Sequence, residues 1–359
     1  MTVISRYILR TYLRMILLCG SAFAAIYLTI DLLEKVGKFT RSGGTPMQIL
    51  LFFACKLPEI ATQIIPLAVL MATLLTLGSF SRNSELIAMR SAGAGLVRIS
   101  MPLLSAALLL SLTNLVLAEL VVPQSYERMD YVEEVLIGKK SPTTFFRKGT
   151  IWFREGDAIL KAMLFDAETT TLKGVTLWRL GAGMQPEERL DSPRGGLSED
   201  RWVLYDLVQR TYSSGALVKS SRLRELPIPL KLSLSDLKVV GKRAENMGFF
   251  DLRRYCKTLS DGGYDPSRYL TLLHAKLAAP FSPLVMAFIG IPFALKSGRS
   301  KGPAIGIGLS LVIGLCFFIS NAFLISFGNA GALPPVVAAW AANLLFIAAG
   351  IWLGLTLDQ

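Results

Sequence analysis

Apolar residues gather in six long segments, which stand in two groups of three. Each segment reaches or exceeds the roughly 20 residues with which an α-helix crosses the hydrocarbon core of a bilayer. Between the third and fourth segments the chain has the mixed composition of a water-soluble domain. The pattern predicts a polytopic membrane protein with one extramembrane domain inserted between its helices. The segments cover residues 13–33, 47–80, 99–122, 270–295, 303–327 and 334–355.

The polar middle region alternates apolar and polar residues with a period of two. Short runs of this kind, separated by clusters of Gly, Pro, Asp and Ser, are typical of half-buried strands and predict an all-β sandwich or open barrel. A stretch with helical spacing follows at 249–259 and predicts an amphipathic helix that lies on the domain or on the outer membrane interface. The predicted strands lie at 151–153, 158–165, 175–180, 202–207 and 226–232.

These patterns divide the chain into three parts. Residues 1–122 hold the first three membrane helices and a short polar helix at 82–95, residues 123–266 form the β domain with its amphipathic helix, and residues 267–359 hold the last three membrane helices. The predicted fold class is therefore membrane α-helical with an inserted all-β domain.

Lysine and arginine are unevenly divided between the short segments that flank the predicted membrane helices. If the amino terminus is cytoplasmic, nine fall on the cytoplasmic side and three on the other, and short cytoplasmic loops of membrane proteins carry the excess. The bias predicts that both termini are cytoplasmic and that the central domain lies outside the cytoplasm. The nine are Arg6, Arg10, Arg14, Arg82, Arg90, Arg98, Lys296, Arg299 and Lys301, and the three are Lys35, Lys38 and Arg41.

The formal net charge of +12 does not indicate a nucleic-acid partner. Much of the positive charge lies at helix ends, where it fixes topology, and no nucleic-acid-binding motif accompanies it. The mean hydropathy of +0.49 is that of a membrane protein. We therefore expect a membrane as the surroundings of this chain and no nucleic acid as its partner.

The sequence offers no set of residues for catalysis or metal binding. The four cysteines are scattered without a CxxC pair, and His274 is the single histidine. No GxSxG or HExxH motif is present, and the nearest imitation of a phosphate loop, residues 298–302, has the wrong spacing. We expect a non-enzymatic chain without a bound cofactor or metal, unable to hydrolyse ATP through such a loop.

The connection between the second and third apolar segments is the most distinctive polar stretch. Within residues 81–95, Ser84 suits a helix N-cap and Gly93 suits the left-handed conformation that ends many helices. The stretch predicts a short, self-capped helix that a membrane protein could present to a cytoplasmic protein. Glu85 suits either an ion pair with that protein or simply the positive end of the helix dipole.

Four short motifs lie in or beside the first three predicted membrane segments: residues 4–8 (ISRYI), 66–68 (PLA), 84–93 (SELIAMRSAG) and 123–124 (PQ). Together they resemble the permease subunits of the lipopolysaccharide-export ABC transporter, the LptF/LptG family. The layout of three helices, β domain and three helices extends the resemblance over the whole chain. Two paralogous subunits share this plan, and residues 149–153 and 251–269 look closer to the G type.

The resemblance implies a part in a larger machine. In the family, an F and a G subunit form a heterodimer over two copies of a cytoplasmic ATPase, LptB, which uses ATP and Mg²⁺. Lipopolysaccharide enters a cavity lined by the first and fifth helices and passes through periplasmic β-jellyroll domains to the bridge proteins LptC and LptA. The chain would then lie in the inner membrane of a Gram-negative bacterium, with its β domain in the periplasm.

The resemblance also assigns roles to residues. The matching loop makes residues 82–95 a coupling helix that docks on the ATPase, through Glu85, Leu86, Met89 and Arg90. Basic residues at the periplasmic end of the first helix bind the phosphorylated glucosamine headgroup in the family, and Lys35, Lys38 and Arg41 occupy that region here. One departure stands out, because Asp31 replaces the lysine that some G-type members carry late in the first helix.

Two other functions were weighed. A structural or assembly membrane protein would recruit envelope partners through its β domain and would need no coupling helix. A proton-coupled carrier would need a buried acidic pair and an internal repeat, neither of which the sequence shows. The exporter permease is favoured because it accounts for the coupling loop and the outward β domain together.

Overall fold

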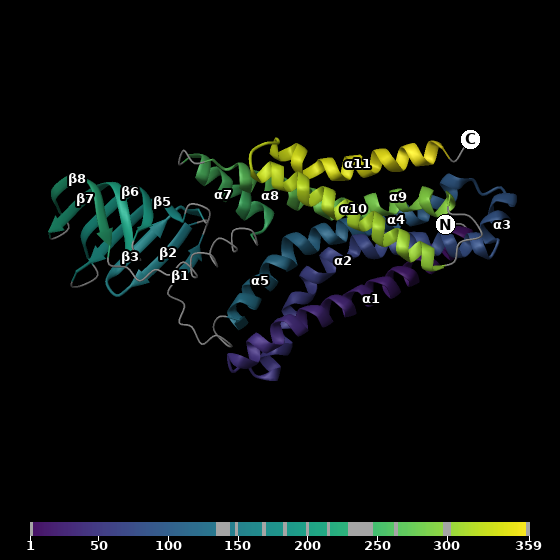
Figure 1. The fold of residues 1–359 in the computed structure, drawn as a ribbon, viewed down its shortest axis with the longest axis horizontal. Helices are drawn as coiled ribbons and strands as arrows, with labels where there is room; N and C mark the ends of the chain where they lie inside the picture. Colours follow the sequence, from purple (N-terminus) through teal and green to yellow (C-terminus); the bar gives the residue numbers. More distant parts are fainter. Residues whose placement is uncertain are drawn as a thin grey trace. The chain divides into compact units, whose positions relative to one another are not determined.

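The computed structural model describes residues 3–133, 144–147, 150–166, 170–181, 185–198, 201–213, 216–228, 247–261, 265–296 and 303–356. The chain forms two compact units, Met1–Lys139 with Leu270–Gln359, and Lys140–Tyr269. The first unit is helical, and the second holds the β-strands (Figure 1). The observed fold class is the predicted one, a helical membrane protein with an inserted β unit.

Within the described part of the chain, six helical stretches are long and apolar enough to cross a membrane. Figure 1 shows both chain ends and the short helix α3 (Glu85–Ser91) at the same end of the helical unit. Six membrane crossings return the chain to the side on which it began, and α3, which lies between the second and third crossings, is on that same side. The six stretches are Val3–Arg41, Pro46–Arg82, Leu96–Met129, Ser267–Leu295, Ile305–Asn329 and Pro335–Leu355.

Helix α2 (Pro46–Arg82) is the central element of the helical unit. It starts behind a capping box in which Thr45 and Gln48 bond to each other's backbone. It packs against α1 (Val3–Arg41), α9 (Ser282–Lys296) and α10 (Pro303–Asn329). Helices α1 and α10, in contrast, bury few of their apolar side chains in this chain. The unit therefore has a packed centre and apolar flanks that suit lipid or a partner chain.

Two prolines lie inside α2, yet the helix runs unbroken through both. Pro66 has no N–H, so the carbonyl of Thr62 loses its helical partner. The Nδ2 of Asn114, on α4 (Leu96–Val116), donates to that carbonyl at 3.5 Å. A neighbouring helix thus satisfies the group that the proline frees, as a membrane interior requires.

The third span does not end at residue 122, where the sequence predicted its end. A π-helical turn, η1 (Leu117–Val121), follows α4, and α5 (Val122–Tyr131) continues the helix. The N–H of Val122 bonds to the carbonyl of Leu117, which widens the turn directly before Pro123. The wider turn admits a proline that a sequence argument treats as a helix end. The predicted boundary at 123 therefore falls inside helical residues.

The fourth span is interrupted by a short 3₁₀ turn. Helix α8 (Ser267–Ala278) passes through η4 (Ala279–Phe281) into α9, and Pro280 and Pro283 explain the interruption. Side chains from two other helices bond the freed backbone. The hydroxyl of Ser111 on α4 accepts from the N–H of Leu284 at 3.1 Å, and Asn343 on α11 (Pro335–Leu355) donates to the carbonyl of Ala278 at 2.8 Å.

The described strands form one antiparallel sheet, curved in Figure 1. Its neighbours follow the sequence order β1-β2-β3-β5-β6-β7-β8, with β4 beside β5, so the sheet is a meander. The core on one face includes Phe153, Leu177, Leu190 and Trp202. The strands are β1 (Thr144–Arg147), β2 (Thr150–Glu155), β3 (Ala158–Ala162), β4 (Leu164–Asp166), β5 (Thr171–Leu180), β6 (Pro186–Ser198), β7 (Arg201–Ser213) and β8 (Ala216–Ile228).

Sequence reasoning located β2, β3, β5 and β7, joined β4 to β3 as one strand, and missed β1, β6 and most of β8. Strand β6 carries Gly195 and Gly196 and many charged residues, so its sequence lacks the expected alternation. It forms because it lies between β5 and β7 and pairs with both over most of its length. Residues 229–232, the end of the last predicted strand, lie outside the described residues.

The predicted amphipathic helix is confirmed as α7 (Phe249–Asp261). Leu252, Tyr255 and Leu259 are buried, whereas Arg253 and Lys257 are exposed. Packing of one face thus fixes this helix on its unit.

Candidate functional site

Helix α3 and its flanks contain the predicted coupling residues. Gly93 is left-handed at φ 82°, and the N–H groups of Gly93 and Ala94 bond to the carbonyls of Arg90 and Met89, both at 3.0 Å. This is the Schellman arrangement that the sequence suggested. The predicted cap at Ser84 is wrong: its backbone is left-handed at φ 62°, not extended as an N-cap requires, and its side chain makes no capping bond.

The predicted coupling side chains lie on two sides of α3. Leu86 and Met89 are 8% and 9% exposed and belong to the core of the helical unit, so they anchor the helix instead of forming its outer surface. Ile87 and Arg90 are exposed on the other side. The outer face of α3 therefore differs from the predicted contact set, and Ile87 was the residue that the prediction left out.

Glu85 connects α3 to the start of α1. The hydroxyl of Tyr7 donates to its Oε2 at 2.9 Å, and Nδ2 of Asn83 donates to its Oε1 at 3.3 Å. The ring of Tyr7 also stacks on Phe80, with centroids 5.6 Å apart. The carboxylate that the sequence offered to a partner is thus already bonded within the chain.

The predicted headgroup residues lie toward the end of α1. Lys35 is half-buried, with Nζ 3.5 Å from Oδ1 of Asp31 and 4.9 Å from the ring centre of Phe52. Arg41 is exposed at the last residue of the helix. The side chain of Lys38 lies outside the described part of the structure.

Sequence reasoning missed Lys56, which is buried on α2. Its Nζ lies 2.8 Å from Oδ1 of Asp31, and the two residues are 7% and 8% exposed. A signal was present in the sequence. Asp31 lies ten residues before the end of α1 at Arg41, and Lys56 lies ten residues after the start of α2 at Pro46. Antiparallel helices joined by a short loop bring residues equally far from the loop to the same level.

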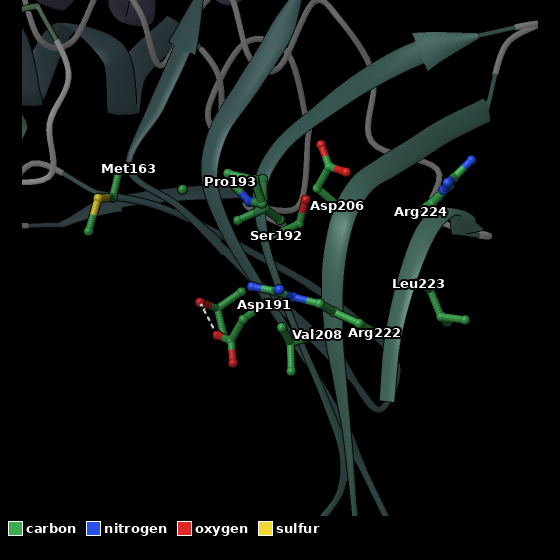
Figure 2. Close-up of a pocket in the computed structure, with 12 residues that line it drawn as sticks. Met163, Asp191, Ser192, Pro193, Asp206, Val208, Arg222, Leu223 and Arg224 are labelled. Carbon is green, nitrogen blue, oxygen red and sulfur yellow. Dashed lines mark hydrogen bonds between the residues drawn. The ribbon is translucent and has the colours of Figure 1, made fainter. Parts of the chain in front are cut away.

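The β unit contains an open cavity of about 740 Å³ on the sheet. In Figure 2 the side chain of Arg222 extends toward Asp191, whereas Arg224 points away from it. Charged side chains of both signs share the lining with apolar residues such as Met163 and Leu223. The lining residues are Met163, Gly174, Val175, Thr176, Asp191, Ser192, Pro193, Asp206, Val208, Arg222, Leu223 and Arg224.

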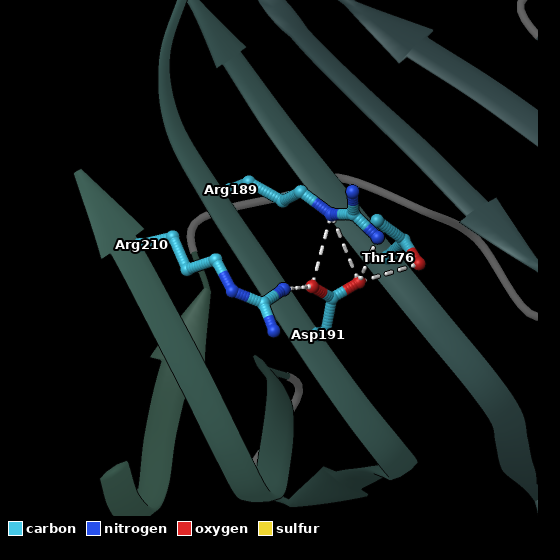
Figure 3. A network of polar contacts seen from close by, with 4 residues as sticks. All are labelled: Thr176, Arg189, Asp191 and Arg210. Atoms are coloured by element: carbon cyan, nitrogen blue, oxygen red, sulfur yellow. Dashed lines mark hydrogen bonds and ion pairs between the residues drawn. The ribbon is translucent and has the colours of Figure 1, made fainter. Parts of the chain in front are cut away.

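Asp191 is the centre of a charged network across three strands (Figure 3). Arg189 donates to it at 2.9 Å, Thr176 donates to it at 3.0 Å, and Arg210 forms a further ion pair with it. The network is partly exposed, so each pair adds little stability by itself. Elsewhere in the sheet, Trp152 on β2 and Trp178 on β5 stack with centroids 5.9 Å apart.

Among the described residues, no group of three or more His, Cys, Asp or Glu side chains is arranged to hold a metal ion. The polar clusters that do occur consist mainly of ion pairs and of groups that satisfy helix backbone.

Comparison with known proteins adds the remaining evidence. The family model "Lipopolysaccharide export system permease LptF/LptG" matches residues 6–356. "Lipopolysaccharide export system permease protein LptG" of Haemophilus influenzae is 23% identical over 333 residues, 92% of this chain and 91% of the relative. LptG of Escherichia coli K12 is 22% identical over 98% of this chain and 97% of the relative. LptF of the same strain is 24% identical over 98% of this chain and 94% of the relative. Although the percentage identities are similar, the matches to LptG are statistically more significant than the match to LptF.

Proposed function

The chain belongs to the LptF/LptG family of lipopolysaccharide export system permeases, and from this premise we propose that it is the G-type subunit of an ATP-driven lipopolysaccharide exporter. It pairs with an F-type subunit over two copies of the ATPase LptB. It extracts lipopolysaccharide from the outer leaflet of the inner membrane and passes it to the periplasmic bridge proteins LptC and LptA. The chain itself is non-catalytic, and ATP and Mg²⁺ are used by the ATPase.

The proposed orientation places both termini in the cytoplasm and the β unit in the periplasm of a Gram-negative bacterium. The excess of Lys and Arg near the termini and near α3 supports this orientation. The common position of both chain ends and α3 in the helical unit agrees with it (Figure 1). In this orientation α3 faces the ATPase.

The observation that carries the proposal is the way in which α3 is anchored to the helical unit. Leu86 and Met89 anchor the helix in the core, and the Schellman turn at Gly93 fixes its end. Helix α3 therefore moves with α2 and α4, which it joins, and it exposes Ile87 and Arg90 for docking. A short, firmly anchored helix is a means by which movement of an ATPase reaches membrane helices.

The long first helix supports the proposed lipid path. At 39 residues α1 extends about 58 Å, well beyond the roughly 30 Å hydrocarbon core. Its apolar residues are exposed in this chain, and Leu17 and Leu33 are 75% and 73% exposed. Lys35, Lys38 and Arg41 follow at the far end, where cations can meet lipid phosphates.

The test is co-purification of the tagged chain in mild detergent, with mass spectrometry of the bound proteins and lipids. The double variant Arg90→Glu with Ile87→Asp reverses the charge at one exposed position of α3 and places a charge at the other. We expect it to reduce the recovered ATPase at least tenfold while the second permease stays bound. Lys219→Glu, an exposed charge reversal in the β unit, is the matched control. Recovery of the ATPase unchanged by the double variant would contradict the coupling role.

A structural protein that recruits envelope partners is the alternative. It predicts that the wild-type chain co-purifies with envelope proteins but with no ATPase and no lipopolysaccharide. The wild-type sample therefore separates the two functions, and the variants test the coupling helix.

A further inference from the structure

One carboxylate lies between two lysines where α1 and α2 pack together. Oδ1 of Asp31 is 2.8 Å from Nζ of Lys56 and 3.5 Å from Nζ of Lys35. The side chain of Lys56 is 8% exposed and that of Lys35 is 29% exposed. The cluster thus has a closed side at Lys56 and an open side at Lys35.

Packing alone does not explain these charges within membrane-spanning helices. A buried ion pair is often no more stable than apolar residues of similar volume. Asp31 lies two residues before the end of the apolar segment 13–33, and α1 continues for ten residues beyond it. Ionisable residues buried within a membrane segment mark sites of function more often than sites of stability.

The second carboxylate oxygen of Asp31 is the most informative atom of the cluster. Oδ2 is buried, and no donor among the described residues reaches it. Both lysines approach Oδ1 instead. An unsatisfied buried acceptor costs about 1–3 kcal/mol, and more when it is charged. The folded chain therefore holds one strong acceptor unsatisfied, and a donor that enters from the exposed Lys35 side would satisfy it.

The charge of the cluster defines the rest of the ligand. Lys35 is the more exposed of the two lysines and lies 4.9 Å from the ring centre of Phe52, and Glu133 acts on it electrostatically in addition to Asp31. The exposed cation suits an anionic group, and the unsatisfied oxygen of Asp31 suits a hydrogen-bond donor. A phosphorylated sugar carries both groups on one small ring, whereas the phosphate of a simple phospholipid carries no such ring of hydroxyls.

We propose that Asp31 contacts the lipid headgroup directly, accepting through Oδ2 a hydrogen bond from a hydroxyl or amide group of its phosphorylated sugar while Lys35 binds the phosphate. Lys56 is a positioning residue that holds Asp31 through Oδ1. The inference rests on the proposed function and adds a basis for its selectivity: the site distinguishes a phosphorylated glycolipid from other anionic lipids.

The experiment uses the complex of this chain with its partner permease and ATPase. Binding of bisphosphorylated lipid A is compared with binding of dioleoyl phosphatidic acid, which has a phosphate but no sugar. Asp31→Asn is expected to weaken lipid A binding roughly tenfold and to leave phosphatidic acid binding equal or tighter. Glu34→Gln, which removes an exposed carboxylate from the same helix, is the matched control and should change neither.

Stability is separated from binding with two further variants. Lys56→Met leaves Asp31 without its closer partner and should lower both the melting temperature and lipid A binding. Asp31→Asn combined with Lys56→Met removes the whole pair, so the melting temperature should recover while lipid A binding stays roughly tenfold weaker. A merely structural pair would recover both properties together.

Three results would overturn the inference: equal weakening of both lipids by Asp31→Asn, wild-type lipid A affinity in the recovered double variant, or binding of free glucosamine 1-phosphate as tight as that of lipid A. Extraction of lipid A from proteoliposomes upon ATP addition is measured in parallel. If the wild-type complex extracts lipid A but Asp31→Asn leaves the ratio of lipid A affinity to phosphatidic acid affinity unchanged, the inference alone fails. If the wild-type complex neither binds nor extracts lipid A, the proposed function fails.

Discussion

The hydroxyl of Tyr7, on the first turns of α1, donates to Oε2 of Glu85, the first residue of α3, at 2.9 Å. This bond joins the proposed coupling helix to the helix whose other end carries Lys35 and Arg41. Because α1 is one continuous helix, a displacement of α3 reaches the proposed headgroup end along it. The Tyr7–Glu85 bond therefore connects the proposed ATPase-docking helix directly to the helix that carries the proposed headgroup residues.

Replacing Tyr7 by phenylalanine removes that bond and keeps the ring that stacks on Phe80. We expect Tyr7→Phe to leave assembly of the complex unchanged, because α3 stays anchored by Leu86 and Met89. ATP-driven lipid extraction per ATP hydrolysed should fall several-fold, since the hydrogen bond to a charged acceptor contributes about 1.5–3 kcal/mol. Glu85→Gln keeps an acceptor and should show a smaller loss. An unchanged ratio of extraction to hydrolysis in Tyr7→Phe would exclude the connection.

Close packing of α10 against α11 and α8 is predicted to depend on Gly328, near the end of the helix. A Cβ at Gly328 would lie 2.5 Å from Cβ of Ala338 on α11 and 2.8 Å from Cγ2 of Thr271 on α8. Gly328→Ala should therefore destabilise the helical unit by about 1–3 kcal/mol. Gly308 lies on the same helix with nothing within 4 Å of such a Cβ, so Gly308→Ala is the matched control. Unfolding in mixed detergent micelles measures both, and equal stability of the two variants would refute the packing argument.

The sequence was sufficient for the features that depend on local pattern. Six apolar runs identify six spans, alternation identifies four of the strands, and Gly93 identifies the end of α3. Each of these is encoded by neighbouring residues. Features that depend on residues far away in the sequence could not be predicted in this way. Strand β6 is formed by its neighbours β5 and β7 in the sheet.

The candidate site shows the same division. The basic residues of α1 were visible from their position, whereas the burial of Leu86, Met89 and Lys56 depends on which helix faces which. An apolar residue on a seven-residue helix can face either the core or a partner, and the sequence of α3 does not distinguish the two. The ion pair of Lys56 with Asp31 likewise depends on how α1 and α2 pack together.

The thiol of Cys256, on α7, is predicted to be unreactive at neutral pH. It is 4% exposed, and burial raises its pKa to about 11 from an ordinary value of 9.0. In a variant whose other three cysteines are replaced by alanine, modification by N-ethylmaleimide at pH 8 should be at least tenfold slower than in the unfolded chain.

The same shift makes stability pH-dependent. Below pH 9 both folded and unfolded chains keep the Cys256 proton, so its contribution to stability is fully present. Between about pH 9 and 11 the unfolded chain loses the proton first, and the contribution is lost. Cys256→Ala should remove this dependence, and rapid labelling of the native chain at pH 8 would contradict the burial.

The contact between Asn114 and the carbonyl of Thr62 leads to a prediction about coupling between two substitutions. Asn114→Leu alone has two opposed effects, because it leaves the Thr62 carbonyl without a donor but also removes Oδ1 of Asn114, which is buried and has no donor among the described residues. Its single effect on stability is therefore a poor test. Pro66→Ala supplies the missing N–H to the Thr62 carbonyl, so in that background the amide of Asn114 is no longer needed there.

A double-mutant cycle with Asn114→Leu and Pro66→Ala isolates the contact. We expect a coupling free energy of about 0.5–1 kcal/mol, the size of hydrogen bonds between membrane helices, with Asn114→Leu less harmful in the Pro66→Ala background. Thr113→Val on the same helix, where the hydroxyl bonds only the carbonyl of Leu109, is the control and should show no coupling to Pro66→Ala. Additive effects of Asn114→Leu and Pro66→Ala would mean that α2 tolerates Pro66 without help from α4.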